Sequence, residues 1–126
     1  MKFTIAVSTL LLAATSSVSA LGINCRGNSN CGGTLCQLTD LLAQANRLPD
    51  GNIYFPGQHI VCCGDNAIAS GLCAFTQSTS ENITGARVKE LLQGLVNHGC
   101  GKCGSNPFQN NDVSQGQLTV NWVSQR

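Results

Sequence analysis

Residues 97–104 read NHGCGKCG, and this stretch decides how the rest of the chain is held together. A helix is predicted to end here, because Gly99 stands where a left-handed residue commonly follows a helix C-terminus. Two cysteines, Cys100 and Cys103, follow at once. A second spaced pair of cysteines lies near the front of the chain: Cys25 and Cys31. If the two pairs bridge each other, one short segment ties the N-terminal end to the end of the helix.

Upstream of this stretch, apolar residues recur at the spacing of one helix face. They are Val88, Leu91, Leu92, Leu95 and Val96. Thr84 is a suitable N-cap, so the sequence predicts a helix over Gly85–Asn97. A second amphipathic helix is predicted earlier, with Thr34 as its cap and a stop at residues 49–51, Pro-Asp-Gly. Its apolar stripe is Leu35, Leu38, Leu41, Leu42 and Ala45.

Four further segments indicate strands. Ile60 and Val61 favour a strand over residues 59–63, with residues 72–76 as its hairpin partner, and residues 52–55 suit a brief strand. The clearest strand is 116–123, where alternate residues on one face are apolar: Leu118, Val120 and Trp122. Residues 104–107 and 110–112 carry loop signals. Two helices and four or five strands indicate an α+β fold, with the helices on one face of an antiparallel sheet.

Residues 1–20 have the pattern of a secretory signal peptide. Lys2 gives a positive start, residues 3–14 are an almost unbroken apolar run, and Val-Ser-Ala at 18–20 suits signal peptidase. The apolar run is well short of the roughly 20 residues that span a bilayer. We therefore expect a secreted, extracellular protein that consists of one domain over residues 21–126.

The charges of that domain balance. Outside residues 1–20, six lysines and arginines face six carboxylates. Electrostatic binding to nucleic acid or to an anionic membrane needs a basic surface, which this composition does not provide. No second apolar run approaches the length of a membrane span, so we expect no stable membrane insertion, and we expect a monomer.

All eight cysteines follow the predicted cleavage site: Cys25, Cys31, Cys36, Cys62, Cys63, Cys73, Cys100 and Cys103. An even number of cysteines in a short secreted chain predicts four disulfides, but eight cysteines allow 105 connectivities. Adjacent residues on a strand point to opposite faces, so Cys62 and Cys63 should have different partners. One of those partners is plausibly Cys73, across the hairpin.

Catalytic and metal chemistry is disfavoured by the same cysteine count. Cys100 and Cys103 have redox C-x-x-C spacing and, with His98, could hold zinc, but paired cysteines leave no thiol for either role. An acid–base pair for a small hydrolase could be drawn from His59 or His98 with Glu81 or Glu90, but no nucleophile motif accompanies them. We expect no enzyme, no metal and no cofactor.

Two basic residues beside the spaced cysteines are candidates for contact with a target. Lys102, held between Cys100 and Cys103, would be presented at low entropic cost, and Arg26 follows Cys25. The alternative is that both are ordinary solvated cations. Separately, Asn82-Ile83-Thr84 is an N-glycosylation sequon, which predicts an exposed loop and a glycan at Asn82.

Three blocks of the chain resemble the killer protein 4 family, the virally encoded toxins of corn smut and their fungal relatives. The blocks are LGINCRG at 21–27, NHGC with CGS at 97–105, and NDVS leading to GQLTVN at 111–121. The resemblance implies a disulfide-rich two-layer α/β-sandwich, in which two antiparallel helices cross one face of an antiparallel sheet of about five strands. It also implies Cys25–Cys100 and Cys31–Cys103 disulfides, which leaves the other two bridges to Cys36, Cys62, Cys63 and Cys73.

Proteins of this family are similar to channel-blocking toxins that inhibit the growth of fungi, and in some cases of plant roots, by interfering with calcium uptake. The implied partner is a target-cell surface protein such as a calcium channel. The lysine associated with that activity falls here at Ile60 or Val61, and the terminal cysteine of the smut toxin has no counterpart before Arg126. We hypothesise that Lys102 or Arg26 replaces the lysine. The alternative is a secreted effector that binds a wall polymer or a host protein and has no channel activity.

Overall fold

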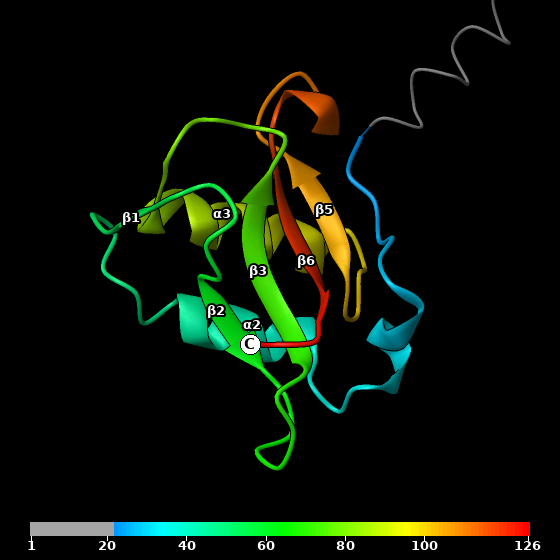
Figure 1. The fold of residues 1–126 in the computed structure, drawn as a ribbon. Coiled ribbons are helices and arrows are strands. Elements are labelled where there is room, and N and C mark those ends of the chain that lie inside the picture. Colours follow the sequence, from blue (N-terminus) through cyan, green and yellow to red (C-terminus); the bar gives the residue numbers. More distant parts are fainter. Residues whose placement is uncertain (1–21) are drawn as a thin grey trace, which may run out of the picture.

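The computed structural model describes residues 22–126, so the expected signal peptide lies outside the described residues. Figure 1 shows the longer helices behind a sheet. The helices are α2 (Leu38–Ala45) and α3 (Gly85–Asn97), with short 3-10 helices η1 (Ser29–Gly33) and η2 (Val113–Gln115). The strands are β1 (Ile53–Tyr54), β2 (Val61–Cys63), β3 (Gly71–Gln77), β4 (Ile83–Thr84), β5 (Gly104–Pro107) and β6 (Gln117–Val123). No helix in this part of the chain has the length and apolar character needed to cross a membrane.

The strands form two antiparallel sheets. The main sheet has the order β2-β3-β6-β5, and β1 pairs only with β4. The predicted α+β class is confirmed. The expected single sheet of about five strands, and with it the sandwich as stated, is not matched. Strand β1 does not join the main sheet but pairs with β4, directly before α3.

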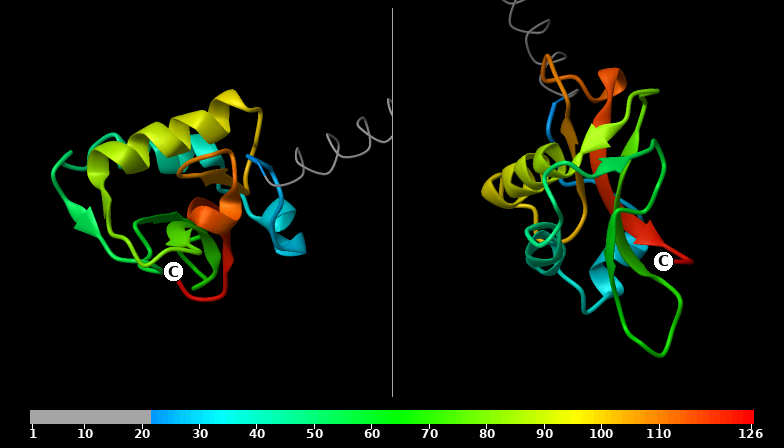
Figure 2. Two further views of the ribbon diagram at one scale, coloured as in Figure 1. Left: turned by 90° about the horizontal axis from the view of Figure 1, so that it is seen from above. Right: turned by 90° about the vertical axis from the view of Figure 1, so that its left-hand side faces the viewer.

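The two helices run antiparallel on one side of the main sheet, as Figure 2 shows. The N–H of Leu38 donates to the carbonyl of Gly101 at 3.0 Å, which places the start of α2 beside the end of α3. The N–H of Gly85 donates to the carbonyl of Asn52 at 2.8 Å, which places the chain beyond α2 at the start of α3.

The core lies between the helices and the main sheet. Mostly apolar residues of β3 and β6 oppose each other on the helix side: Leu72 pairs with Trp122, Ala74 with Val120, and Thr76 with Leu118. Facing them are the apolar sides of α2 and α3, whose buried residues include Leu38, Leu41, Val88, Leu92 and Leu95. Each of these side chains is fully excluded from solvent, and burial of a leucine side chain contributes on the order of 2 kcal/mol.

Helix α3 begins and ends where the sequence predicts. The Thr84 hydroxyl accepts from the N–H of Arg87 at 3.2 Å and so caps the first turn. At the other end, the N–H of Gly99 donates to Val96 and that of Cys100 to Leu95, at 3.0 and 3.2 Å. Gly99 has φ +95°, so this is a Schellman motif that requires a left-handed residue.

Helix α2 starts later than predicted. Leu35 is 88% exposed rather than part of the buried stripe, and the Thr34 hydroxyl accepts from the N–H of Cys36 instead of capping a helix. The helix begins at Leu38, where Gln37 and Asp40 form a capping box. A disulfide from Cys36 to β2 holds this segment outside the helix, so a tertiary bond overrides the local periodicity.

Strand β5 occupies residues predicted to be loop. It pairs with β6 over Gly104–Pro107, and the hydroxyls of Ser105 and Thr119 are hydrogen-bonded at 2.9 Å across the pair. The Asn106 amide donates to the carbonyl of Leu91 in α3 at 2.9 Å. The small polar residues of β5 form hydrogen bonds at the edge of the sheet instead of packing in the apolar core. Hydrophobic periodicity therefore does not reveal this strand.

Candidate target-binding surface

Four disulfides use all eight cysteines, so none is free. They join Cys25 to Cys100, Cys31 to Cys103, Cys36 to Cys63, and Cys62 to Cys73. The first two are the pairs that the family resemblance implies. Cys62 and Cys63 leave β2 on opposite faces, since Cys62 opposes Cys73 on the outer face while Cys63 opposes Leu72 on the helix side. Neither a redox thiol pair nor a thiolate zinc site is present among these sulfurs.

The first two disulfides tie the N-terminal segment to the chain after α3. Asn24 and Ser105 exchange both backbone hydrogen bonds, at 3.0 and 2.9 Å, and so extend the edge of the sheet by one bridge. The two bonds lie directly beside the Cys25–Cys100 disulfide. Arg26, which follows, is therefore attached to the most strongly cross-linked part of the molecule.

The Lys102 ammonium is directed at the protein rather than at solvent. It donates to the carbonyl of Gly32 at 3.2 Å and to that of Thr34, and its side chain is half-buried. A lysine used in this way holds the turn after η1 in place. Its charge is therefore partly neutralised by carbonyl dipoles, which makes Lys102 the weaker of the two candidate target contacts.

Arg26 is exposed, and within residues 22–126 its guanidinium has no hydrogen bond or ion pair. Three other cations are engaged: Arg87 with Glu90 and the Phe108 carbonyl, Lys89 with Asp50, and Arg126 with carbonyls of the β2–β3 loop. Arg47 is the other exposed cation without a partner in the described chain. Arg26 thus combines a rigid attachment with a free charge.

Ile60 and Val61, the two positions at which the family resemblance implies a lysine, are apolar in this chain. Val61 is buried in β2 facing the helices, and Ile60 is half-buried against the core. His59, the neighbouring residue, is exposed on the outer side, with its ring centroid 5.8 Å from that of Phe75. The outer face of β2 and β3 therefore presents an imidazole and an aromatic ring, but no lysine.

The candidate acid–base residues are not assembled into a site. His98 is the C-cap of α3, while His59 precedes β2. In the described part of the chain, no hydrogen bond or ion pair joins either histidine to a carboxylate, and Glu90 is paired with Arg87. Asp112 is used locally: the hydroxyl and N–H of Ser114 hold the pKa of its carboxyl below the usual value.

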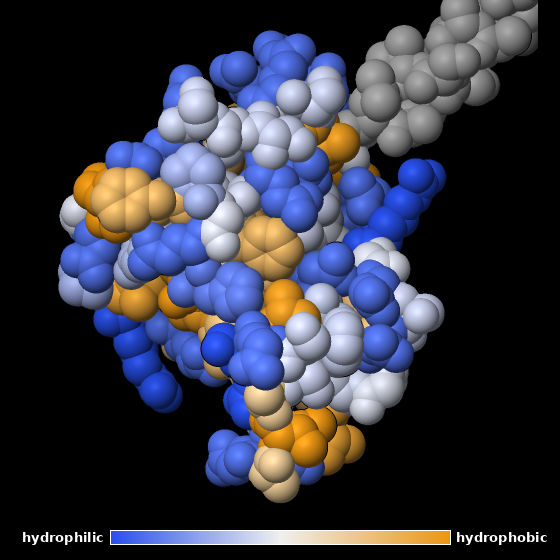
Figure 3. Space-filling model, viewed as in Figure 1, coloured by the Kyte–Doolittle hydropathy of each residue, from blue (hydrophilic) through white to orange (hydrophobic). Residues whose placement is uncertain are grey.

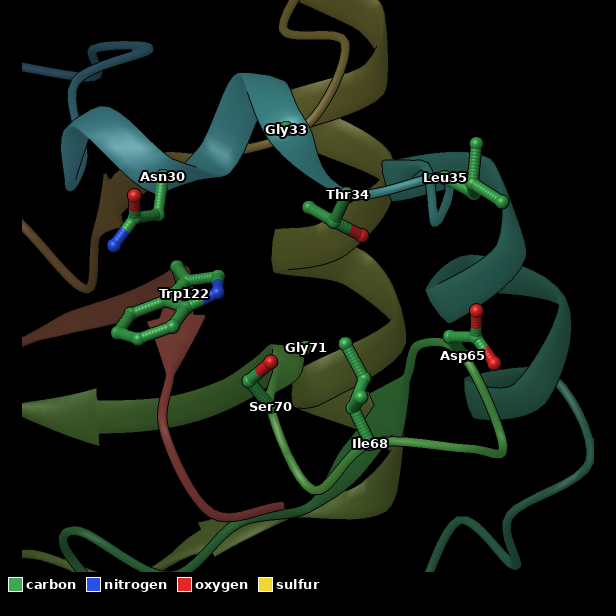
Figure 4. Close-up of a pocket in the computed structure, with 9 residues that line it drawn as sticks. All are labelled: Asn30, Gly33, Thr34, Leu35, Asp65, Ile68, Ser70, Gly71 and Trp122. Atoms are coloured by element: carbon green, nitrogen blue, oxygen red, sulfur yellow. The ribbon is translucent and has the colours of Figure 1, made fainter.

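Two of the hollows on the surface of residues 22–126 have linings that the sequence does not indicate. The first, of about 290 Å³, lies between residues 30–35, the β2–β3 loop and Trp122 (Figure 4). The second, of about 320 Å³, is lined in part by Asn82, Arg87 and Phe108. Asn82 is exposed beside it, so a glycan there would cover this second hollow. Each hollow joins segments far apart in the chain, which is why no local motif marks it.

Comparison with known proteins agrees with this arrangement. The Kp4 family model matches residues 8–124. The KP4 killer toxin of Ustilago maydis P4 virus is 43% identical over 110 residues, which cover 85% of this chain and 84% of that protein. The match to the family model includes all eight cysteines of this chain. The chain therefore belongs to the Kp4 killer-toxin family.

Proposed function

We propose that this protein is a secreted killer toxin that inhibits the growth of other cells, fungal competitors or a plant host. The observation that carries the proposal is its 43% identity to the KP4 killer toxin over most of both chains. Four disulfides in a domain of this size support an extracellular protein, because such bridges persist in oxidising compartments.

The proposed action depends on surface contact rather than catalysis. The two histidines are separate from carboxylate partners in the described chain, and every cysteine is bridged. A rigid, monomeric body that presents fixed side chains binds its target with little loss of conformational freedom. No cofactor, metal or nucleic acid is required by this mode of action.

Interference with calcium uptake is the proposed mechanism, with Arg26 as the contact. A pathway for calcium is lined by acidic side chains, so a fixed cation on a toxin is attracted to its mouth. Val61 and Ile60 supply no charge, and the Lys102 ammonium is bonded to backbone carbonyls. Arg26, which follows the Cys25–Cys100 disulfide, is exposed and its guanidinium has no partner within residues 22–126.

The competing proposal is that the protein is a secreted binding module that recognises a wall polymer or a host protein and has no channel activity. The observation that favours it is that Val61 is buried and Ile60 is half-buried and apolar, so neither supplies the charge that the family resemblance associates with channel blockade. The two functions differ in a measurable way, because only the first predicts rescue of growth by added calcium.

The test is to add purified, oxidised protein to fungal and plant cells while recording growth and calcium influx. We expect growth inhibition, reduced influx and rescue by calcium. Arg26→Ala should abolish the effect on influx, whereas Arg47→Ala, which removes an equally exposed and unpartnered cation, should not. Inhibition without any change in influx favours the binding module. Equal activity of the two variants removes Arg26 from the mechanism.

A further inference from the structure

The first surface hollow is built around the single tryptophan of the chain. Trp122, near the end of β6, lies beneath the turn formed by η1, and the β2–β3 loop lies on the other side (Figure 4). The residues that line it include Asn30, Thr34, Leu35, Asp65, Ile68 and Ser70. Its volume of about 290 Å³ is just below the range of drug-sized ligand sites, about 300–1,000 Å³. It can therefore hold a short segment of a ligand.

Both walls of this hollow are held in place. Lys102 fixes the first wall by donating to the carbonyls of Gly32 and Thr34. Arg126 fixes the second by donating to the carbonyls of Asp65 and Ile68 at 2.9 and 2.7 Å, and to Ala69 at 3.2 Å. The two walls are also joined covalently, because the Cys36–Cys63 disulfide links the residue after Leu35 to the start of the β2–β3 loop. Preorganised walls reduce the ordering cost of binding.

Polar groups that converge on this hollow are not used by the fold. In the described part of the chain, the Asn30 amide, the Ser70 hydroxyl and the Trp122 indole N–H make no hydrogen bond. One oxygen of the Asp65 carboxylate accepts from the N–H of Ala67 at 2.9 Å, and the other has no partner there. The hollow thus offers donors and acceptors on both sides of an aromatic ring.

Apolar side chains stand at the rim. Leu35 is 88% exposed and Ile68 is 56% exposed, although both are large aliphatic residues. Figure 3 shows apolar atoms at the lower edge of the molecule, where the β2–β3 loop lies in the same view in Figure 1. The site therefore combines an indole ring, two aliphatic side chains at the rim, a few hydrogen-bonding groups and one carboxylate.

We propose that this hollow, the Trp122 pocket, is a binding subsite for a neutral oligosaccharide of pyranose sugars. The C–H bonds on one face of a pyranose ring pack on the electron-rich face of an indole. The hydroxyls around the ring edge are both donors and acceptors, which suits an amide, a hydroxyl, an indole N–H and a carboxylate oxygen. The Asp65 carboxylate disfavours an anionic ligand, and the aliphatic rim disfavours a small ion.

Trp122 makes the test specific, because all tryptophan fluorescence of the protein comes from this pocket. The intact oxidised protein is titrated separately with β-linked glucose oligomers and with N-acetylglucosamine oligomers, up to about 10 mM, since weak single subsites bind near 1 mM. We expect a saturable change in emission with one of the two series, which identifies the sugar. No saturable change with either series overturns the proposal.

Variants then locate the binding. Asn30→Ala combined with Ser70→Ala removes two hydrogen-bonding side chains at the surface and leaves Trp122 in place, so the reporter is kept. Loss of two hydrogen bonds should weaken binding about tenfold. Phe55→Ala, at a separate exposed apolar position, is the matched control and should change nothing. Unchanged affinity in the Asn30/Ser70 double variant overturns the assignment. Sugar binding and growth inhibition are measured separately, so the failure of one is distinct from failure of the other.

Discussion

Removal of the two disulfides between the N-terminal segment and the chain after α3 should be strongly non-additive. Cys25–Cys100 and Cys31–Cys103 close loops with sequence separations of 75 and 72. In the loop-entropy model, closing a loop of that size removes about 4.5 kcal/mol of unfolded-chain entropy. Cys25 is six residues from Cys31, and Cys100 three from Cys103. When one bridge is present, the other therefore closes a ring of only about nine residues, which contributes about 2.5 kcal/mol.

The expected losses follow directly. Cys25→Ala with Cys100→Ala should cost about 2.5 kcal/mol, and so should Cys31→Ala with Cys103→Ala. Replacing all four should cost about 7 kcal/mol, which is about 2 kcal/mol more than the sum of the two pairs. A small domain has a free energy of unfolding of about 5–15 kcal/mol, so the fourfold variant should be barely folded or unfolded at room temperature.

Urea unfolding followed by circular dichroism measures these values, with linear extrapolation to water. The Cys62→Ala and Cys73→Ala pair is the control, because its bridge has a sequence separation of 11 and spans a single hairpin. Its loss should simply add to that of either other pair. A fourfold variant that unfolds cooperatively, with a loss no larger than the sum of its two parts, would refute the reasoning that either bridge shortens the loop closed by the other.

Three further substitutions test local features. Gly99→Ala places a Cβ at φ +95° and should cost about 1–2 kcal/mol in thermal unfolding, whereas Gly101→Ala, where an added Cβ meets nothing, should be near neutral; equal losses contradict the Schellman assignment. Leu92→Ala empties a fully buried position on α3 and should lower the free energy of unfolding by about 2–5 kcal/mol, and a loss below about 1 kcal/mol would mean that the helix is not packed as described. The Ser114 hydroxyl and N–H lower the pKa of Asp112, so its contribution to stability is present above its usual pKa of about 4 and is lost as pH falls through the lowered value. Asp112→Asn should therefore flatten the fall in stability below about pH 4, and an unchanged pH profile argues against the linkage.

The sequence predicted those elements whose signals are local. The bounds of α3 follow from the Thr84 cap, the apolar spacing and Gly99, all of which the structure uses. Strand β6 follows from the alternation of Leu118 and Val120. In both cases the residues that specify the element also bury its face in the core, so local and tertiary preferences agree.

Other features depend on partners that are remote in the chain. The start of α2 was misplaced because Cys36 is bonded to Cys63, 27 residues away, and β5 was missed because its hydrogen bonds come from β6. The position of Lys102 between two cysteines marks it as a candidate target contact, but it does not reveal that the carbonyl of Gly32, 70 residues away, accepts a hydrogen bond from its ammonium. The Trp122 pocket is likewise formed by three distant segments. Periodicity and spacing carry no information on such pairings.

The central claim is that the activity belongs to a rigid, cross-linked surface. Its most direct test compares growth inhibition by the purified oxidised protein with that of the same protein after reduction and alkylation, on fungal and plant cells. Because four bridges hold the surface together, the oxidised protein should inhibit growth and the alkylated protein should not. Inhibition that survives alkylation, or an oxidised protein that inhibits none of the cells tested, would contradict the account.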